Sequence, residues 1–279
     1  MKTPICDMLG IEFPLVAFTH CRDVVTEVSK AGGMGVLGAV GLSPEQLETE
    51  LTWIDDNIDG KPYGVDLLIP NKMLGKAEQP SAEQVVAMIP PKHTDFTDGI
   101  LKRHQIETGD LGDQTRALFT AFGDNMRESG AKRLLEVAFA HPIKVIVNAL
   151  GVPPYYMLQM GKDNGVAVGA LVGARTHAIR QVQAGVDFLV VSGTEGGGHC
   201  GSVSTIVLVP EVVEAIEPYG DVPILAAGGI VTGRQMAACM AMGASGVWTA
   251  SVWLTTAEAE TIPTVKEKML AAESSDTVR

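Results

Sequence analysis

Several features that would assign the chain to a particular class of protein are rare in its sequence or missing from it. The 279 residues include four cysteines and no C-x-x-C pair, which argues against a zinc ribbon and predicts reduced thiols in a cytoplasmic protein. No apolar run approaches the ~18 residues of a membrane-spanning helix, and the start lacks the apolar core of a signal peptide. The formal net charge of −12, with no Lys/Arg run, gives no sign of a nucleic-acid surface. We therefore expect a cytoplasmic globular protein without a nucleic-acid or membrane partner.

What the sequence does contain is a regular alternation of short apolar runs and helical patterns. Aromatic residues make up only 5% of the chain although 46% of it is hydrophobic, as in α/β folds with close helix–sheet packing. The apolar runs lack polar alternation, which indicates buried parallel strands. They lie at 14–17, 34–37, 63–68, 144–149, 166–171, 187–191, 223–226 and 246–249.

Helical sequence follows these runs. One helix is expected to open at Ser43, which is followed by Pro44 and, three residues on, by the Gln46 of a capping box. Other helices are expected at 23–31, 154–164, 175–184, 210–216, 233–242 and from about 258 to 270.

About eight β/α units in roughly 250 residues predict a TIM (β/α)8 barrel in a single domain, 1–279. An open doubly wound sheet is the alternative. The polar segment 71–141 interrupts the alternation and predicts an insertion or lid after the third strand. Its end, 131–141, has a helical pattern that fits the third barrel helix.

Three glycine-rich turns follow late strands. They are Gly193–Gly201, the stretch "AAGGIVTG" with Gly228 and Gly229, and "GVWTAS" at the end of the last strand. Glycines let backbone N–H groups approach a ligand, and the loops after strands seven and eight of a barrel commonly bind phosphate. Because neither a Walker motif nor a clean dinucleotide motif is present, the turns point to FMN or a sugar phosphate.

His199 lies in the first of these turns. A loop after a barrel strand suits a catalytic imidazole, which can exchange a proton near neutral pH; the alternative is a solvent-exposed loop histidine. Neighbouring Cys200 could be a nucleophile, although nothing nearby marks a reactive thiol. His20, His141 and His177 are interpreted as structural or surface residues.

The motifs together resemble one family. The stretches "FPLVAFTH…VSKAGGMGVLG", "GTEGGGHCG" and "PILAAGGIVTGRQMAACMAMGASGVW" are similar to those of the nitronate monooxygenase (2-nitropropane dioxygenase) family, whose relatives include FMN-dependent enoyl-ACP reductases and NADH:quinone reductases. The resemblance spans most of the chain, and 71–141 is its weakest part.

The resemblance implies an FMN-binding TIM barrel with His199 as its catalytic residue and no metal. It also implies that the cofactor is bound by Ala17, Phe18, Thr19, Asp66, Gly193, Gly228, Gly229, Ala250 and Ser251.

Some residues depart from the family pattern. Asp66 stands where the family commonly has Asn; it cannot donate an amide hydrogen bond, and an ionised carboxylate would disfavour an anionic reduced flavin. Phe18-Thr19 replaces a common Pro-Met pair, and the chain stops at "SSDTVR", where relatives commonly continue.

We accordingly expect oxidation of an alkyl nitronate or nitroalkane by oxygen to a carbonyl compound and nitrite, in a protein that could be a homo-oligomer. The alternatives are NAD(P)H-dependent reduction of a quinone or enoyl thioester, and a non-catalytic FMN binder. A barrel with IMP-dehydrogenase-like chemistry would need Cys200 as an attacking thiolate.

Overall fold

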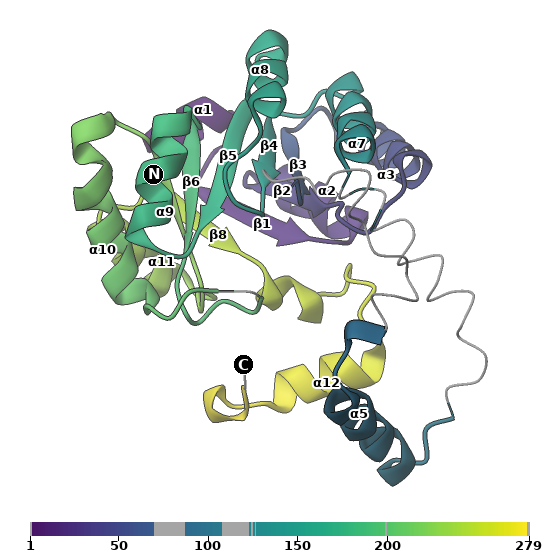
Figure 1. Ribbon diagram of the computed structural model, residues 1–279. Helices are drawn as coiled ribbons and strands as arrows, with labels where there is room; N and C mark the ends of the chain where they lie inside the picture. The colour runs from purple at the N-terminus through teal and green to yellow at the C-terminus, as the bar shows by residue number, and fades with distance from the viewer. Residues whose placement is uncertain are drawn as a thin grey trace.

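The computed structural model describes residues 2–69, 87–107, 123, 125, 127–198 and 200–277, and it contains a closed barrel of parallel strands. The strands pair in sequence order from β1 to β8, and β8 returns to β1 (Figure 1). This confirms the predicted TIM barrel and excludes the open sheet. The strands are β1 Leu15–Thr19, β2 Met34–Gly38, β3 Tyr63–Leu67, β4 Val145–Asn148, β5 Ala167–Val172, β6 Phe188–Ser192, β7 Ile224–Ala227 and β8 Gly246–Thr249.

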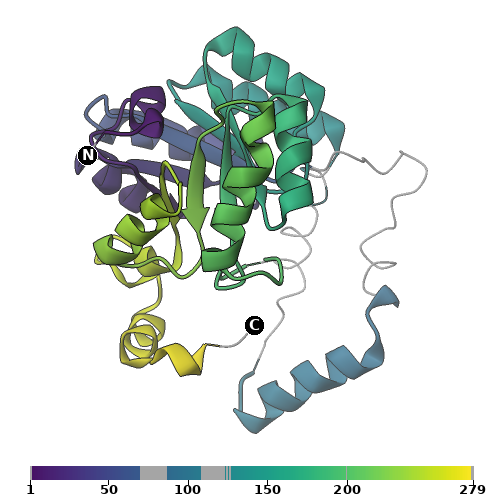
Figure 2. The ribbon, with the colours of Figure 1, turned by 90° about the vertical axis from the view of Figure 1, so that its left-hand side faces the viewer.

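Helices surround the barrel (Figure 2). The capping box predicted at Ser43 is present: its hydroxyl accepts from the amide of Gln46, and the Gln46 side chain accepts from the amide of Ser43. The surrounding helices are α2 Arg22–Lys30, α3 Pro44–Asn57, α7 Glu128–Ala140, α8 Tyr155–Asn164, α9 Arg175–Ala184, α10 Thr205–Ile216 and α11 Gly233–Ala241.

α10 begins earlier than the predicted 210–216, because Pro210 lies inside the helix and does not open it. Proline is costly in a helix interior. Here that cost is offset by the burial of Leu208, Val209 and Val212 against the barrel.

The amino end of the barrel is closed by α1 (Pro4–Leu9), a short helix that the sequence pattern did not predict. Its Ile5, Cys6 and Leu9 pack in one buried cluster with inward-facing strand residues such as Val16 and Val36. The barrel interior is therefore filled with side chains at this end, and polar groups gather at the carboxyl ends of the strands.

Part of the predicted insertion 71–141 is described. α5 (Pro91–Arg103) lies within it and has no buried residue, whereas α7 packs against α3 and α8 and so takes the place between β3 and β4 in the ring of helices. Residues 70–86, 108–122, 124 and 126 lie outside the described part. The assignment of 1–279 to one domain with an insertion stays a prediction.

After β8 the chain forms η2 (Ser251–Thr255) and then α12 (Pro263–Ala271), which lies apart from the barrel in both views (Figures 1 and 2). The helix predicted from about 258 thus begins five residues later, at a proline. The remaining short helices are η1 (Glu217–Tyr219) and η3 (Ser274–Asp276).

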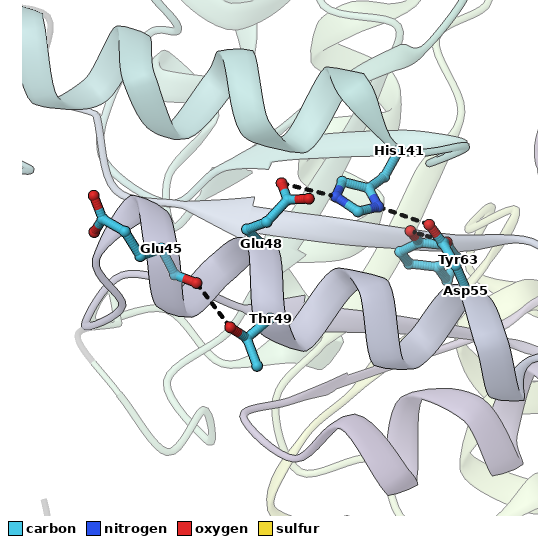
Figure 3. Close-up of polar contacts among 6 residues, drawn as sticks. All are labelled: Glu45, Glu48, Thr49, Asp55, Tyr63 and His141. Atoms are coloured by element: carbon cyan, nitrogen blue, oxygen red, sulfur yellow. Dashed lines mark hydrogen bonds and ion pairs between the residues drawn. The ribbon is translucent and has the colours of Figure 1, made fainter.

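A polar cluster connects α3 to β3 and to the end of α7 (Figure 3). The hydroxyl of buried Tyr63 donates to Oδ1 of Asp55 at 2.6 Å, and Nδ1 of His141 lies 2.6 Å from Asp55 Oδ2. His141 Nε2 lies 3.3 Å from Glu48 Oε2. Burial and the Asp55 carboxylate raise the pKa of Tyr63. Since Tyr63 opens β3, the cluster lies at the amino end of the barrel and has a structural role, as expected for His141.

Asp55→Ala is expected to lower the free energy of unfolding by about 1–3 kcal/mol, because the buried Tyr63 hydroxyl loses its acceptor. Chemical denaturation measures the change. Asp56→Ala on the exposed side of α3 is the control and should stay within about 0.5 kcal/mol of the parent. Equal stabilities of the two variants would contradict the role given to the cluster.

Candidate active site

The inner face of β1 places an aromatic group at the mouth of the barrel. Side chains alternate along a strand, so Val16 and Phe18 point inward; Phe18 is half-buried and stacks on Trp248 of β8, with ring centroids 6.0 Å apart. Ala17 and Thr19 point outward: Ala17 packs in a cluster with Val24 of α2, and the Thr19 hydroxyl accepts from the amide of Cys21. Of the three predicted contacts on β1, the side chain of Phe18 alone faces the interior.

The three glycine-rich turns meet beside this mouth. A Cβ on Gly228 would lie 2.8 Å from the Thr205 hydroxyl, and one on Gly197 would lie 2.9 Å from Oγ of Ser251. A Cβ on Gly193 would overlap Thr205, the first residue of α10. The turns after β6, β7 and β8 therefore form one contiguous surface, as their order in a barrel predicts.

Glu195 holds the first turn in place. Its Oε2 accepts from the amide of Thr205 at 2.9 Å and from the Thr205 hydroxyl at 2.8 Å. The carboxylate thus binds the start of α10, where negative charge is favoured. The Glu195 side chain thus has a structural role in this turn.

The turn after β7 can bind an anion. Gly228 and Gly229 have φ of +101° and +69°, a region that favours glycine. In the described part of the chain, the amides of Gly228, Gly229 and Ser251 have no protein acceptor. Ala250 and Ser251 are exposed at the start of η2. Free amides on a surface that a Cβ would fill fit the phosphate of a flavin mononucleotide.

Asp66 of β3 has a side-chain oxygen that is unpaired among the described residues. Its neighbours Val65 and Leu67 pack outside the barrel, so its side chain points inward; it is 4% exposed, and Oδ2 has no hydrogen-bond partner in the described part. Burial raises the pKa of the Asp66 carboxyl well above its usual value. A protonated carboxyl can donate a hydrogen bond. Burial thus favours the neutral form of Asp66, which could donate a hydrogen bond that an ionised carboxylate could not.

His199 lies outside the described residues, so its predicted role stays a prediction. Cys200 beside it donates its S–H to the carbonyl of Thr194, with Sγ 3.5 Å from the oxygen. An IMP-dehydrogenase-like reaction would need this sulfur as an attacking thiolate, and that alternative stays a prediction.

The mouth also contains His20, which was interpreted from sequence as structural or surface. It follows β1 directly, is exposed, and its Nδ1 lies 2.7 Å from the carbonyl oxygen of Gly38. Its ring contacts Phe18 edge to face, with centroids 5.1 Å apart. The period-2 spacing of Val16, Phe18 and His20 is the signal that places it on the inner face.

A model of one protein family matches almost the whole chain, over residues 2–278; the family is described as nitronate monooxygenase. The chain belongs to the nitronate monooxygenase family. A Mycobacterium tuberculosis protein that carries a provisional monooxygenase name is 53% identical over 100% of this chain and 73% of its own length. A Staphylococcus saprophyticus protein with the provisional name nitronate monooxygenase is 27% identical over 100% of this chain and 75% of its own length.

Solved structures show the same barrel. FabK from Thermotoga maritima superposes with a TM-score of 0.70 at 26% identity, covering 100% of this chain and 70% of its own. Nitroalkane oxidase from Streptomyces ansochromogenes superposes with a TM-score of 0.73 at 23% identity, covering 94% of this chain and 71% of its own. The latter similarity concerns the fold alone.

Membership of the nitronate monooxygenase family makes this protein a flavin-dependent oxidoreductase that acts on a small-molecule substrate. The free amides of the glycine-rich turns and the unpartnered Asp66 carboxyl are compatible with that cofactor class. No helix in the described ranges has the length and apolar character of a membrane span.

Proposed function

We propose that this member of the nitronate monooxygenase family binds FMN and oxidises alkyl nitronates with oxygen to a carbonyl compound and nitrite. The observation that carries the proposal is the contiguous surface of the turns after β6, β7 and β8 beside the aromatic wall of Phe18 and Trp248. Such a surface offers free amides to a phosphate and an apolar face to a ring and a small alkyl chain.

In this proposal the residues of the chain bind the cofactor and orient it. The amides of Gly228, Gly229 and Ser251 would hold the phosphate, and a protonated Asp66 would donate to a polar atom of the ring. Gly193 allows α10 to pack close to the first turn, and Glu195 keeps that turn in place. Bound FMN would supply the redox chemistry, as cofactors do in flavoenzymes.

His199 is proposed as the substrate-facing histidine of the loop after β6. It would hydrogen-bond the nitro oxygens of a bound anion or remove the α-proton of a neutral nitroalkane. Because a preformed nitronate has already lost that proton, turnover of nitronates depends on the first of these roles.

The test is direct. Purified protein is expected to show flavin absorption bands and, with propyl-2-nitronate, to form nitrite and consume oxygen. His199→Ala should lower this rate by about 10²-fold or more, whereas His177→Ala on the exposed face of α9 should not. A colourless protein that rejects added FMN would show a non-catalytic role or a different ligand. Flavin bleaching by NADH or NADPH without oxygen, together with no nitrite from nitronates, would favour the reductase alternative.

A further inference from the structure

The inward-facing side chains at the carboxyl ends of the strands form the floor of the barrel mouth. Phe18 and Trp248 belong to the inner cluster, and so does Leu171 of β5, whose neighbours Ala170 and Val172 pack outside the barrel. Phe18 and Leu171 are only half-buried, so both present apolar surface to the mouth. Because β1 and β5 lie on opposite sides of the closed barrel, apolar groups flank the floor on both sides.

Asp66 is an acidic group in this floor. On the neighbouring strands its register partners are Gly38 of β2 and Val147 of β4, and neither carries a charge that could offset its own. The Asp66 side chain is 4% exposed, and its Oδ2 has no hydrogen-bond partner among the described residues. His20 is titratable, but it contacts the carbonyl oxygen of Gly38 and is exposed at the rim. The carboxyl is therefore enclosed by uncharged groups.

Cationic side chains at this end of the barrel face solvent or other partners. Nη1 of Arg22, at the start of α2, lies 3.4 Å from Oε1 of Glu50, and its Cζ lies 4.5 Å from the ring centroid of Trp53. Arg175 and Arg234, in the first turns of α9 and α11, are exposed, so water and salt screen their charges. None of the eight strands contains Lys or Arg. Across the described ranges, an anion at the mouth thus finds no buried cation.

The charge of a flavin ring at this floor matters because reduction adds electrons to it. Two electrons leave the ring anionic if one proton follows them and neutral if two protons follow. An anionic ring beside Asp66 would lie between a buried acid and apolar side chains, in a medium of low dielectric constant. Its charge would therefore cost free energy that water would otherwise recover. Uptake of a second proton removes that cost.

We propose that this floor keeps the charge of the site unchanged on reduction, so that two electrons enter the bound flavin together with two protons and its reduction potential lies below that of free FMN. The electrons come from the substrate in turnover, or from dithionite in vitro. The protons come from water, and one of them stays in the hydrogen bond between Asp66 and the ring. A lower potential makes the reduced flavin a stronger reductant toward oxygen. The inference rests on the flavin site of the proposed function and names the charge state in which that site works.

The pH dependence of the midpoint potential measures the proton count. Each proton taken up with two electrons contributes about 30 mV per pH unit. The holoprotein, titrated with dithionite against a reference dye, should show a slope of about 60 mV per pH unit between about pH 8 and 9.5, above the range in which histidine changes charge. Free FMN, whose reduced ring is anionic in water at these pH values, should show about 30 mV. The holoprotein potential should lie below that of free FMN, and the gap should widen by about 30 mV, a tenfold change in relative affinity, for each pH unit.

Variants assign the effect to individual residues. Leu171→Lys places a cation in the floor and should raise the potential and lower the slope to about 30 mV per pH unit, whereas uncharged Leu171→Met should change neither. Leu150→Lys, in the turn after β4, adds the same charge at an exposed position and should leave both quantities unchanged, because solvent screens it. Asp66→Asn should also lower the slope, since an amide can donate a hydrogen bond but cannot take up a proton.

The outcomes separate this inference from the proposed function. A protein that takes up no flavin sinks the proposed function and the inference with it. A bound flavin with a slope near 30 mV per pH unit, or with a potential at or above that of free FMN, overturns the inference alone, whether or not nitronates are oxidised. A slope that stays near 60 mV in Leu171→Lys or in Asp66→Asn overturns the role given to that residue. The slope of the wild-type protein decides even where a variant does not fold.

Discussion

Asp66→Asn is expected to stabilise the cofactor-free protein, and the gain should grow with pH. The carboxyl is buried inside the barrel, its Oδ2 has no partner in the described part of the chain, and burial raises its pKa well above the ordinary 3.8. A raised folded-state pKa contributes stability that is fully present below the unfolded pKa and is lost as pH rises toward the folded value. The loss amounts to about 1.4 kcal/mol for each pH unit in that window. An asparagine does not ionise, so Asp66→Asn does not lose this stability as the pH rises.

Denaturant unfolding of the two proteins at pH 4, 5, 6 and 7 measures this. Near pH 4 they should differ by no more than about 1 kcal/mol, since both side chains are neutral and polar. At pH 7 Asp66→Asn should be the more stable of the two, because only the aspartate bears the cost of ionisation or of a bound proton at that pH. Asp56→Asn on the exposed face of α3 should show a flat difference. A flat difference for Asp66→Asn as well would mean that the buried carboxyl is stabilised in its ionised form.

Substitutions of Asp66 also test its contribution to flavin binding. The family resemblance implies an asparagine at the position of Asp66, and both a protonated carboxyl and an amide can donate a hydrogen bond. Asp66→Asn should therefore retain flavin binding, whereas Asp66→Leu, which has no donor, should weaken it. Titration of the apoprotein with FMN, followed by flavin absorbance, compares them.

The barrel could be predicted from the sequence because its strands are buried on both faces. Each is a short apolar run without polar alternation, and the eight predicted runs end within two residues of the observed strands. α1 was missed because six residues are too short to show a helical period. The start of α10 was missed because Pro210 suggests a helix start, and only the packing of Leu208 and Val209 shows that the helix begins earlier.

The site could be predicted only in part. Glycine spacing and strand order indicated that the turns around Gly193, Gly228 and Ser251 meet, and they do. The raised pKa of Asp66 could not be predicted, because it depends on whether other elements bring a partner to the carboxyl. The contact that His20 makes could not be predicted for a similar reason: its partner is a backbone carbonyl on the next strand, and a backbone group has no sequence signature.

The largest contrast between two similar substitutions is expected on β2. Gly35 faces α2, and a Cβ there would overlap the backbone of Val25, which cannot move without shifting the helix. Gly38 faces the mouth, and a Cβ there would meet only the outer atoms of the His20 and Phe18 rings. Gly35→Ala should therefore lower the free energy of unfolding by about 3 kcal/mol, whereas Gly38→Ala should change it by less than about 1 kcal/mol.

Denaturant unfolding of the two variants measures this contrast. A loss of about 3 kcal/mol in Gly38→Ala as well would mean that the His20 and Phe18 rings are held as firmly as the backbone of α2. Two alanines three residues apart on one strand thus separate the packing of the barrel wall from the packing at its mouth.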